Sequence, residues 1–422
     1  MAAGAAATTA AVAKKRSTMK ATDDHQSKNQ ESLRVLIIGA GSAGLLIAHA
    51  LKKAGIASSV FEADATSTAR PRDWSFGVYW AQSPLASVLD DSVVARIQQS
   101  QVDDRVPTAD DVLPIYNSAA GELICDAPSP YSLRLQRRRW LGLLSEGVDV
   151  QYGKRVVDIQ TDGEMVTATF SDGTRERGNL LFGTEGAHSP TREFLVGSER
   201  ARLIPSPVVG SVAITHMPRE AALKIRAIHP RHVIGLHPVG YFTWMGVHES
   251  AGLENLEDWK FMIMMTWTAT DEESTLPSKG PELVVDMRER AKVCGPLFRE
   301  CYEAIPDDAP MWHSRLSLWP TQEWDDRNGT VTLAGDAAHP MTFHRGQGLN
   351  NAILDAADFM EKLNAMRSHT AEELKKAVRD YETGLWPRGN EAVRSSELNT
   401  LMVHDWERVL ESPLVKHALR KD

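Results

Sequence analysis

The stretch Arg34-Val-Leu-Ile-Ile38, followed by Gly39-Ala-Gly-Ser-Ala-Gly44, decides the fold of this 422-residue chain. An apolar, β-branched run typical of a strand meets a Gly-x-Gly-x-x-Gly turn directly. The next residues place apolar side chains on one helical face as far as Gly55, which suits a left-handed helix cap. Ser58-Ser-Val-Phe-Glu62 has the pattern of a second strand that ends in an acid. Together these segments predict a β-α-β unit.

Each residue type in this unit has a physical role in binding a dinucleotide. Gly39 permits the tight turn, Gly41 lets the backbone approach a pyrophosphate, and Gly44 lets the helix pack on the strand. The helix N-terminus supplies free N–H groups and the positive end of the helix dipole. Glu62 follows Gly44 by eighteen residues and can accept hydrogen bonds from a ribose diol. An acid at this position favours FAD or NAD over NADP.

Composition and length place the chain among ordinary globular proteins. Apolar residues make up 42% and charged residues 24%, and a net charge of −9 gives no reason to expect nucleic acid as a partner. The length permits two or three domains. Cys125, Cys294 and Cys301 have neither CxxC nor another metal-ligand spacing, so we expect a reducing compartment and no metal site.

The N-terminal residues 1–32 are predicted to form a disordered tail. They are rich in Ala, Thr, Lys and Gln and have almost no large apolar side chains. No apolar segment typical of a signal peptide is present, and Asp23, Asp24 and Glu31 argue against a long mitochondrial presequence. The sequence has no run of roughly 18 apolar residues that could cross a bilayer. We therefore expect a cytoplasmic protein with no membrane span.

The middle of the chain has a different texture. A helix is expected over 134–144, with Arg137, Arg138 and Arg139 near its start. After residue 203, strand-like runs without clean alternation are typical of a sheet covered on both faces. These runs are 208–214, 233–236, 241–245 and 261–267, and a long amphipathic helix is expected over 284–305. The region reads as a second domain inserted into the first.

The chain then returns to a nucleotide-site pattern. A strand, Thr330-Val-Thr-Leu-Ala334, leads into Gly335-Asp-Ala-Ala-His-Pro340 and then Gly346-Gln-Gly-Leu-Asn-Asn351. Because a helix follows, its N–H groups can stabilise an anion or the electron-rich edge of a ring. Asp336 is a strand-end carboxylate that can bind a polyol hydroxyl. The two glycine-rich turns lie about three hundred residues apart, so one cofactor must be long enough to contact both.

These residues resemble the FAD-dependent monooxygenases of the aromatic hydroxylase type, which have the p-hydroxybenzoate hydroxylase fold. The first turn with Glu62 resembles their ADP-binding fingerprint, and Gly335 to Asn350 resembles their ribityl-binding motif. Gly183-Thr-Glu-Gly186 through Arg192 resembles their middle motif, which lies near FAD and NAD(P)H. The resemblance covers about 33–395, and the wording from Gly335 to Asp355 is similar to fungal secondary-metabolite enzymes.

The resemblance implies an α/β fold with three parts after the tail. A Rossmann-like FAD-binding domain would take its first part from 33–203. An inserted mixed β-sheet substrate domain would occupy 204–324. Residues 325–422 would complete the FAD-binding domain and add a C-terminal helical segment, in which Arg388 could close over the FAD domain.

The resemblance also implies roles for single residues. Arg138 would open a helix beside the flavin, and Gly77 would lie in the segment that skirts the isoalloxazine. Asp336 would hold the ribityl chain, while 348–350 would present N–H groups to the pyrimidine edge of the ring. Tyr241 would face the substrate as a catalytic residue. The expected cofactor contacts are Gly39, Gly41, Ser42, Ala43, Gly44, Glu62, Gly77, Arg138, Glu185, Gly335, Asp336, Gly348, Leu349 and Asn350.

Three positions depart from the family pattern. Glu185 stands where an aspartate is usual, and its extra methylene is expected to shift contacts to the cofactor or nicotinamide. Phe343 stands where a proline is usual, and Arg345 where a glycine is common. Since that loop would lie over the reactive face of the flavin, both changes bear on substrate access and on protection of a peroxide.

The activity that the resemblance implies is oxygen transfer to a small molecule. NAD(P)H would reduce FAD, O2 would add to give a C4a-hydroperoxide, and its distal oxygen would pass to the substrate by hydroxylation or epoxidation. The sequence has no second Gly-x-Gly-x-x-Gly for a nicotinamide domain, so NAD(P)H would bind transiently. His237 and Tyr241 could deprotonate a phenol. A large apolar pocket is suggested by Tyr241, Trp244, Met262, Met264 and Trp267.

Other functions stay open at this point. A flavin-dependent halogenase shares the fold, but its Trp-x-Trp-x-Ile-Pro signature is absent from the sequence. An FAD oxidase or dehydrogenase would use the same FAD contacts without oxygen transfer. A non-catalytic flavin-binding protein is a third possibility, supported by the changes at Glu185 and Phe343. The sequence leaves the substrate, the oxidised position, the choice of NADH or NADPH and the oligomeric state undecided.

Overall fold

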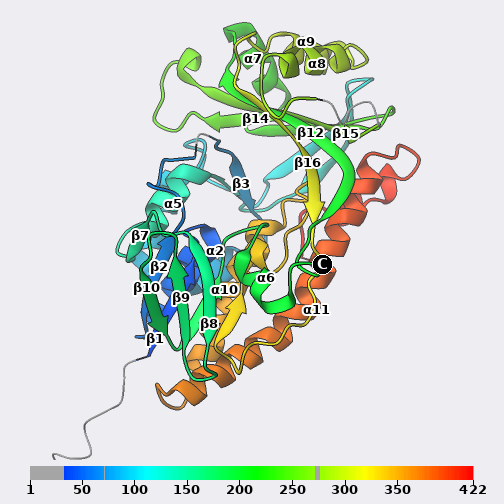
Figure 1. The fold of residues 1–422 in the computed structure, drawn as a ribbon. Coiled ribbons are helices and arrows are strands. Elements are labelled where there is room, and N and C mark those ends of the chain that lie inside the picture. The colour runs from blue at the N-terminus through cyan, green and yellow to red at the C-terminus, as the bar shows by residue number, and fades with distance from the viewer. Residues whose placement is uncertain (1–32, 71, 271–275, 422) are drawn as a thin grey trace, which may run out of the picture.

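The computed structural model describes residues 33–70, 72–270 and 276–421 (Figure 1). The predicted tail over 1–32 lies outside the described residues. A five-stranded parallel sheet forms the centre of the FAD-binding part, in the order β17-β11-β1-β2-β7. Its strands are β1 (Arg34–Ile38), β2 (Ala57–Glu62), β7 (Val150–Tyr152), β11 (Leu180–Gly183) and β17 (Val331–Leu333).

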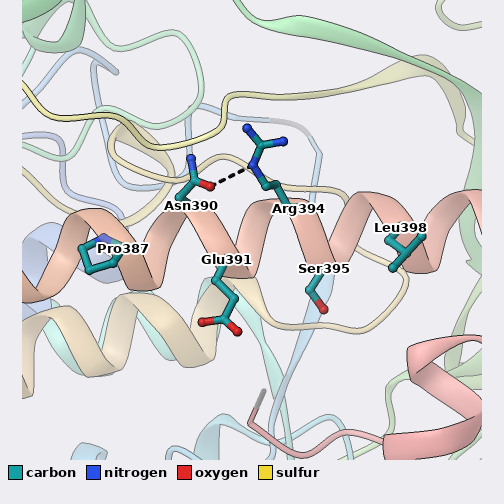
Figure 2. Close-up of a pocket in the computed structure, with 6 residues that line it drawn as sticks. All are labelled: Pro387, Asn390, Glu391, Arg394, Ser395 and Leu398. Atoms are coloured by element: carbon teal, nitrogen blue, oxygen red, sulfur yellow. Dashed lines mark hydrogen bonds between the residues drawn. The ribbon is translucent and has the colours of Figure 1, made fainter.

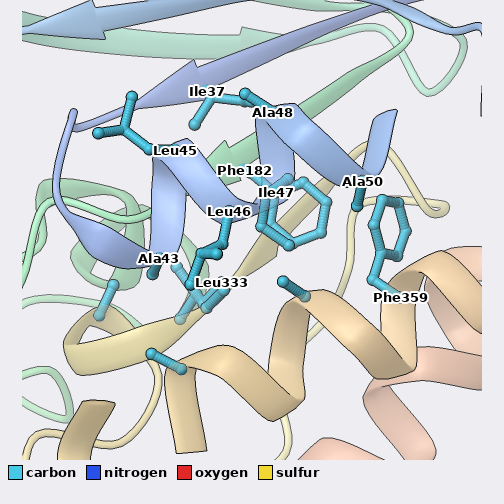
Figure 3. Close-up of a cluster of buried hydrophobic side chains, with 14 of the residues drawn as sticks. Ile37, Ala43, Leu45, Leu46, Ile47, Ala48, Ala50, Phe182, Leu333 and Phe359 are labelled. Atoms are coloured by element: carbon cyan, nitrogen blue, oxygen red, sulfur yellow. The ribbon is translucent and has the colours of Figure 1, made fainter. Parts of the chain in front are cut away.

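Two helices with open N-termini pack on this sheet. They are α2 (Ser42–Lys53), which follows the first glycine-rich turn, and α10 (Gly348–Asn364), which follows the last. Figure 3 shows the apolar side chains between them, where the rings of Phe182 and Phe359 lie 4.7 Å apart. Gly44 is required here because a β-carbon would come within 2.1 Å of the Gly39 carbonyl oxygen. The predicted β-α-β start is therefore the structural centre of the domain.

An antiparallel meander lies against the same sheet (Figure 1). It consists of β8 (Val156–Thr161), β9 (Val166–Phe170) and β10 (Arg175–Gly178). Gly178 packs so closely on β1 that a β-carbon there would lie 2.8 Å from the Arg34 carbonyl oxygen. This meander covers apolar side chains that the parallel sheet would otherwise expose to water.

A second, seven-stranded sheet has the order β16-β12-β15-β14-β13-β4-β5. It is mixed, because β13 pairs with β4 in parallel and its other neighbours are antiparallel. Helices α7 (Arg219–Ile228), α8 (Glu282–Ala291) and α9 (Pro296–Glu303) cover its outer face (Figure 1). The strands are β4 (Val112–Asn117), β5 (Glu122–Pro128), β12 (Ile204–His216), β13 (His232–His237), β14 (Tyr241–Glu249), β15 (Lys260–Thr268) and β16 (Met311–Leu318).

This sheet takes its strands from a wider part of the chain than we predicted. β4 and β5 come from the segment that we assigned to the FAD-binding part, so the second sheet is not built from 204–324 alone. The expected long helix over 284–305 is two helices, because the chain turns at Gly295 and Pro296 starts α9. Proline has no N–H for the preceding turn and favours the first helical position.

The arginine-rich helix also begins later than predicted. Leu133–Gln136 forms β6, which pairs with β3 (Ser75–Val78), and α5 starts only at Arg137 and ends at Ser145. Arg134 therefore lies on a strand and not on a helix. Further short helices are α3 (Gln82–Val88), α4 (Asp91–Val94), η1 (Ile97–Ser100), α6 (Pro190–Val196), η2 (Leu256–Asp258) and η4 (Gly335–Ala337).

The C-terminal helix α11 (Ala371–Val403) runs along both parts of the molecule (Figure 1). It is followed by η5 (Val409–Glu411) and α12 (Pro413–His417). Leu414 and Leu419 of this last segment pack with the side chains on the inner face of the seven-stranded sheet. In the described part of the chain, no helix has the length and apolar character needed to span a membrane.

Candidate active site

One cavity of about 1240 Å³ is lined by residues of all three motifs and by the inner face of the seven-stranded sheet. We call the motif side the cofactor end and the sheet side the substrate end. Most of the expected cofactor residues line the cavity: Gly39, Gly41, Ser42, Ala43, Glu62, Gly77, Arg138, Glu185, Gly335, Asp336, Gly348 and Leu349. Gly44 and Asn350 lie behind this lining.

The first motif presents backbone donors to the cavity. Gly39 has a φ of +106°, and a β-carbon there would lie 2.6 Å from the Thr184 carbonyl oxygen. At Gly41 a β-carbon would enter open space, with its nearest neighbour 4.0 Å away. The structure shows no side-chain cap and no acid in the first turn of α2. Its N–H groups are thus available to an anion.

Glu62 stands beside this turn at the end of β2. Its Oε2 accepts a hydrogen bond from the Ala40 N–H at 2.9 Å, and its Oε1 accepts one from the Asp64 N–H at 2.9 Å. A carboxylate has further lone pairs after two such bonds. Glu62 is therefore held at the cavity wall and can still accept a bond from a ligand hydroxyl.

The middle motif connects the other two. Thr184 Oγ1 donates toward the carbonyl oxygens of Ile38 and Gly39, at 2.8 and 2.9 Å. The buried Arg192 donates from Nη1 to the Ala337 carbonyl oxygen at 3.1 Å. Burial lowers the pKa of Arg192 to about 10, although nearby carboxylates oppose this shift. These contacts fix the three motifs relative to one another.

The longer acid at position 185 turns toward α6. Its carboxylate accepts hydrogen bonds from Ser189 Oγ at 2.8 Å, from the Thr191 N–H at 3.2 Å and from Thr191 Oγ1. Burial raises the pKa of Glu185, while these hydrogen bonds act in the opposite direction. Glu185 lines the cavity, but both of its oxygens are already bonded to the start of α6.

The third motif presents a carboxylate and a second helix N-terminus. Gly335 has a φ of +61°, and a β-carbon there would lie 2.6 Å from the Ala43 β-carbon. The N-cap of α10 has no side-chain hydrogen bond and its first turn has no acid. The Asp336 carboxylate is exposed within the cavity, and burial by the surrounding protein raises its pKa. Such an acceptor suits a polyol hydroxyl.

No role was predicted for Asp355 from the sequence, although its side chain positions this motif. This buried carboxylate accepts hydrogen bonds from the Gly335 N–H at 2.7 Å and Arg388 Nη2 at 2.8 Å, and it pairs with His339 Nε2 at 2.7 Å. Burial opposes its ionisation, but His339 and Arg388 together lower the pKa of Asp355 to about 2. An acid on the apolar face of α10 was the available signal. Arg388 thus joins α11 to α10.

Asn350 holds two segments together behind the cavity. Its Oδ1 accepts from the Tyr79 N–H at 2.9 Å, and its Nδ2 donates to the carbonyl oxygens of Gly77 and Gly346 at 2.9 and 3.0 Å. Tyr79 itself lines the cavity. The Asn350 side chain is thus bonded to the chain itself, and the expected contact of its N–H group with a ring edge stays a prediction.

The substrate end is mostly apolar. Its lining comprises Leu113, Val212, Ile234, Phe242, Trp244, Met262, Met264, Trp312 and Leu419. Leu419 belongs to the C-terminal segment and packs in one apolar cluster with the strand residues. A surface of this kind suits a large apolar ligand and excludes water.

Tyr241 does not lie at this surface. It packs on the helix-covered face of the sheet, with its ring 5.9 Å from that of His237, because successive side chains on a strand point to opposite faces. His237, the last residue of β13, bonds to the Val293 carbonyl oxygen and the Val239 N–H. Trp267 lies on the same outer face, 3.9 Å from the Arg290 guanidinium. These three residues cannot contact a ligand in the cavity.

Polar side chains at the substrate end come from residues for which no role at the site was predicted from the sequence. His344 lies between the Thr266 and Thr400 hydroxyls, with Nε2 and Nδ1 at 3.0 and 2.8 Å. Burial lowers the pKa of His344 well below its usual value, so the ring is neutral. Arg134 and Tyr79 also line the cavity here. Their orientation depends on the β3–β6 pair, which has no sequence motif.

The two departures in the loop over this region have different environments. Phe343 lines the cavity and is 40% exposed, so it lies at an open wall. Arg345 is buried and donates to Ser395 Oγ and to the Arg420 carbonyl oxygen, both at 3.1 Å. Arg345 therefore fastens the loop to α11 and to the C-terminal segment.

Arg138 lies at the cavity wall, and a second hollow lies along α11. Arg138 lines the cavity and donates from Nη2 to the Arg70 carbonyl oxygen at 2.9 Å. The hollow along α11 has a volume of about 550 Å³, and Arg394 Nε donates to Asn390 Oδ1 there at 2.8 Å. Figure 2 shows the residues that line this hollow. It contains none of the motif residues. Within the described ranges, no group of three His, Cys, Asp or Glu side chains could hold a metal.

The donors and acceptors at the cofactor end fit FAD. Two uncapped helix N-termini open toward one cavity, and a glycine at position 41 leaves its wall accessible to a phosphate. The Glu62 and Asp336 carboxylates can accept bonds from sugar and ribityl hydroxyls. The two glycine-rich turns are far apart in the sequence, but they meet at one cavity because α2 and α10 pack on the same sheet.

Comparisons with known proteins agree with this fit. A family model described as FAD binding domain matches residues 32–78 and 142–396. The FAD-dependent monooxygenase cctM of Talaromyces islandicus is 50% identical over 92% of this chain and 97% of that protein. The FAD-dependent monooxygenase phnB of Penicillium herquei is 32% identical over 91% and 94% of the two chains.

Solved structures show the same fold at lower identity. HpxO of Klebsiella pneumoniae, complexed with FAD and uric acid, has a TM-score of 0.72 and 19% identity over 94% of this chain and 95% of that chain. FqzB has a TM-score of 0.73 and 18% identity, over 91% and 88% of the chains. The chain belongs to the family of FAD-dependent monooxygenases that carry this FAD binding domain, and it is an oxidoreductase with FAD as its cofactor.

Proposed function

We propose that this protein uses NAD(P)H and O2 to hydroxylate or epoxidise an apolar aromatic or polyketide-type small molecule in fungal secondary metabolism. The observation that carries the proposal is one cavity that joins the FAD-type groups to an apolar sheet surface. Such a cavity brings a cofactor and an apolar substrate together away from bulk water. The fungal relatives named above support the setting.

At the cofactor end, the role proposed for the protein is to bind and orient FAD. Bound FAD would supply the redox chemistry with NAD(P)H and O2. The N-termini of α2 and α10 would stabilise negative charge at its two ends, and Asp336 would accept a bond from the ribityl chain. Asp355 keeps the Gly335 turn in place through its 2.7 Å hydrogen bond. NAD(P)H would act as a transient reductant.

At the substrate end, the protein orients an apolar ring and excludes water. Trp244, Met262 and Met264 form a wall on the strands, and Leu419 closes it from the C-terminal segment. Excluding water strengthens each polar contact inside the cavity and limits loss of the activated oxygen as hydrogen peroxide. The positions of these side chains, rather than an acid or base on the strands, would select the substrate.

A chain of hydroxyls and imidazoles could carry a proton away from the substrate. The Thr342 and Thr400 hydroxyls lie 2.7 Å apart, and Thr342 lines the cavity. The Thr400 hydroxyl lies 2.8 Å from His344 Nδ1, and Thr266 Oγ1 lies 3.0 Å from His344 Nε2 and 2.8 Å from His404 Nε2. Because the His344 ring is neutral and has a hydroxyl at each nitrogen, it can accept a proton at one nitrogen and release one at the other. His404 Nδ1 faces the Thr400 carbonyl oxygen at 2.6 Å, so this chain of groups ends at His404.

The experiment is NAD(P)H oxidation by the FAD-loaded protein under air, with hydrogen peroxide quantified, against phenolic and polyene polyketides. The expected result is that one compound accelerates oxidation and yields less peroxide than NAD(P)H consumed, with a product heavier by one oxygen atom. Product structure then separates hydroxylation from epoxidation. If compounds are oxidised while all O2 appears as peroxide, the protein is an oxidase or dehydrogenase. If neither nicotinamide reduces bound FAD with any compound, the proposal fails and a non-catalytic flavin-binding role is favoured.

A further inference from the structure

Arg134 is a buried cation at the substrate end of the cavity. Its side chain lines the cavity and the residue is 8% exposed. Nε donates to Ser75 Oγ at 2.9 Å, and the guanidinium also interacts with the Tyr79 hydroxyl. Within the described residues, no carboxylate forms an ion pair with it. A buried charge without a counter-ion is costly, and function is a frequent reason for keeping one.

The surroundings of Arg134 supply no negative charge either. The neighbouring Arg231 is paired with Asp103 at 2.8 Å. Burial lowers the pKa of Arg134, and Arg231 lowers it further. Burial also lowers the pKa of His232 well below its usual value, with Arg134 as the next cause, so that ring is neutral. The site is therefore electropositive and suited to an anion.

The β3–β6 pair determines how this cation is presented. Arg134 lies directly opposite Gly77, and Tyr79 stands in the bend that follows β3. The Tyr79 ring folds over Gly77, where a β-carbon would come within 2.0 Å of it. The absence of a side chain at Gly77 thus lets the Tyr79 hydroxyl reach Arg134.

An aromatic wall stands beside the cation. The Arg134 guanidinium lies 4.5 Å from the centre of the Trp244 ring, and His232 stacks against the same indole at 5.9 Å. Trp244 also lines the cavity, next to Phe242 on the same strand face. An aromatic ring placed on this wall would bring an attached oxygen within reach of the guanidinium and the Tyr79 hydroxyl.

We propose that Arg134, with Tyr79, binds the ionised hydroxyl of an aromatic substrate, so that the enzyme selects phenols and holds them as phenolates. A guanidinium donates charge-assisted hydrogen bonds to an oxyanion, and an ionised hydroxyl makes the ring more electron-rich for oxygen transfer. This inference deepens the proposed function and rests on it for the reaction. The binding it describes can be measured without NAD(P)H or turnover.

Three probes of similar shape test the proposal on the FAD-loaded protein. 4-Nitrophenol reports its ionisation by absorbance, 4-nitrobenzoate carries a carboxylate, and 4-nitroanisole cannot ionise. We expect the pKa of bound 4-nitrophenol to fall by about one unit or more, as for a group beside an opposite charge. Arg134→Gln should abolish that shift and weaken 4-nitrophenol binding about tenfold. Arg134→Lys should keep most of the shift, and 4-nitroanisole should bind wild type and Arg134→Gln within about twofold.

A matched control is available on the outer face of the sheet. Arg226 also lies 4.5 Å from a tryptophan ring, that of Trp259, but neither residue lines the cavity. Arg226→Gln should leave the probe pKa and affinities unchanged. If Arg134→Gln fails to bind FAD or to fold, Tyr79→Phe replaces it and should reduce the shift in part.

Three outcomes would overturn the proposal. The first is that bound 4-nitrophenol titrates like the free compound. The second is that Arg134→Gln weakens 4-nitroanisole as much as 4-nitrophenol. In the third, 4-nitrobenzoate binds in an Arg134-dependent way while bound 4-nitrophenol shows no shift, which identifies a carboxylate site instead. A probe shift without oxygen transfer in any assay would retain the binding site and reject the proposed reaction.

Discussion

The two ends of the cavity are built in different ways. At the cofactor end, the groups that face a ligand are mainly backbone N–H groups at glycine-rich turns, supported by the Glu62 and Asp336 carboxylates. At the substrate end, side chains on alternate strand positions form the wall. A backbone site is specified by the spacing of glycines, whereas a side-chain site is specified by strand register. The first leaves a motif in the sequence and the second does not.

The largest expected effect tests how firmly the cofactor end depends on one buried acid. Asp355→Ala should reduce FAD occupancy at least tenfold and destabilise the protein by roughly 3–5 kcal/mol, because it removes one partner of a buried charge network. Absorbance of the purified protein and thermal unfolding measure the two effects. Asp358→Ala is the matched control, since Asp358 also contacts Arg388, at 3.3 Å, but is 34% exposed. Equal effects of both variants would contradict the role given to Asp355.

A second prediction concerns pH and the side chains that support the substrate end. Burial lowers the pKa of His404 from 6.5 to about 4, so the unfolded state binds a proton in this interval that the folded state does not. The contribution of His404 to the free energy of unfolding is therefore fully present above pH 6.5 and is lost as the pH decreases to about 4. By linkage this one group accounts for about 3 kcal/mol.

His404→Gln should make that loss smaller, as measured by denaturant unfolding at pH 7 and pH 4.5. Other buried histidines, including His232 and His344, titrate in the same direction, so part of the loss will persist. His369→Gln changes an exposed histidine and should follow wild type. A His404→Gln curve that is parallel to the wild-type curve would show that the buried imidazole does not contribute in this way.

The third prediction tests the assignment of strand faces at the substrate end. Trp244→Ala should lower kcat/KM by about tenfold or more, because it removes the aromatic wall beside Arg134. FAD content should stay within about twofold, since Trp244 lies on β14 of the seven-stranded sheet and belongs to none of the three motifs. Steady-state kinetics with the substrate found in the oxidation assay give the result. A large loss of FAD together with activity would mean that the two ends are not separable.

The smallest expected effect is at Tyr241. Tyr241→Phe should change kcat/KM by less than about twofold, because the side chain packs on the helix-covered face with His237. The same kinetic assay applies, with Trp244→Ala as the comparison. A tenfold loss of kcat/KM in Tyr241→Phe would indicate that Tyr241 belongs to the site and would require a different arrangement of the sheet.

These contrasts explain what could be predicted from the sequence. The β-α-β start, the mixed sheet and the convergence of three motifs were predictable because glycine spacing and apolar runs determine them. The mixed sheet was assigned to 204–324 because its β4 and β5 strands are separated from the rest by more than seventy residues, as their ranges show. Pairing between distant strands has no local signal.

The candidate site was predictable at one end. Of the expected cofactor residues, all but Gly44 and Asn350 line the cavity. The Asn350 side chain joins Gly77 and Gly346. Tyr241 and its neighbour Phe242 were equally plausible in the sequence, because a strand covered on both faces has no alternation that separates them. The sequence predicted Arg134 on a helix. Its position in the structure follows from the pairing of β6 with β3, which the sequence did not predict.

The most direct test of the central claim is the fate of molecular oxygen. FAD-loaded protein is supplied with NAD(P)H, ¹⁸O2 and the compound that best accelerates NAD(P)H oxidation, and the product is analysed by mass spectrometry. The account predicts a product that contains one ¹⁸O atom, in an amount close to the NAD(P)H consumed minus the peroxide formed. A product without ¹⁸O, with all consumed O2 recovered as hydrogen peroxide, would contradict oxygen transfer by this protein.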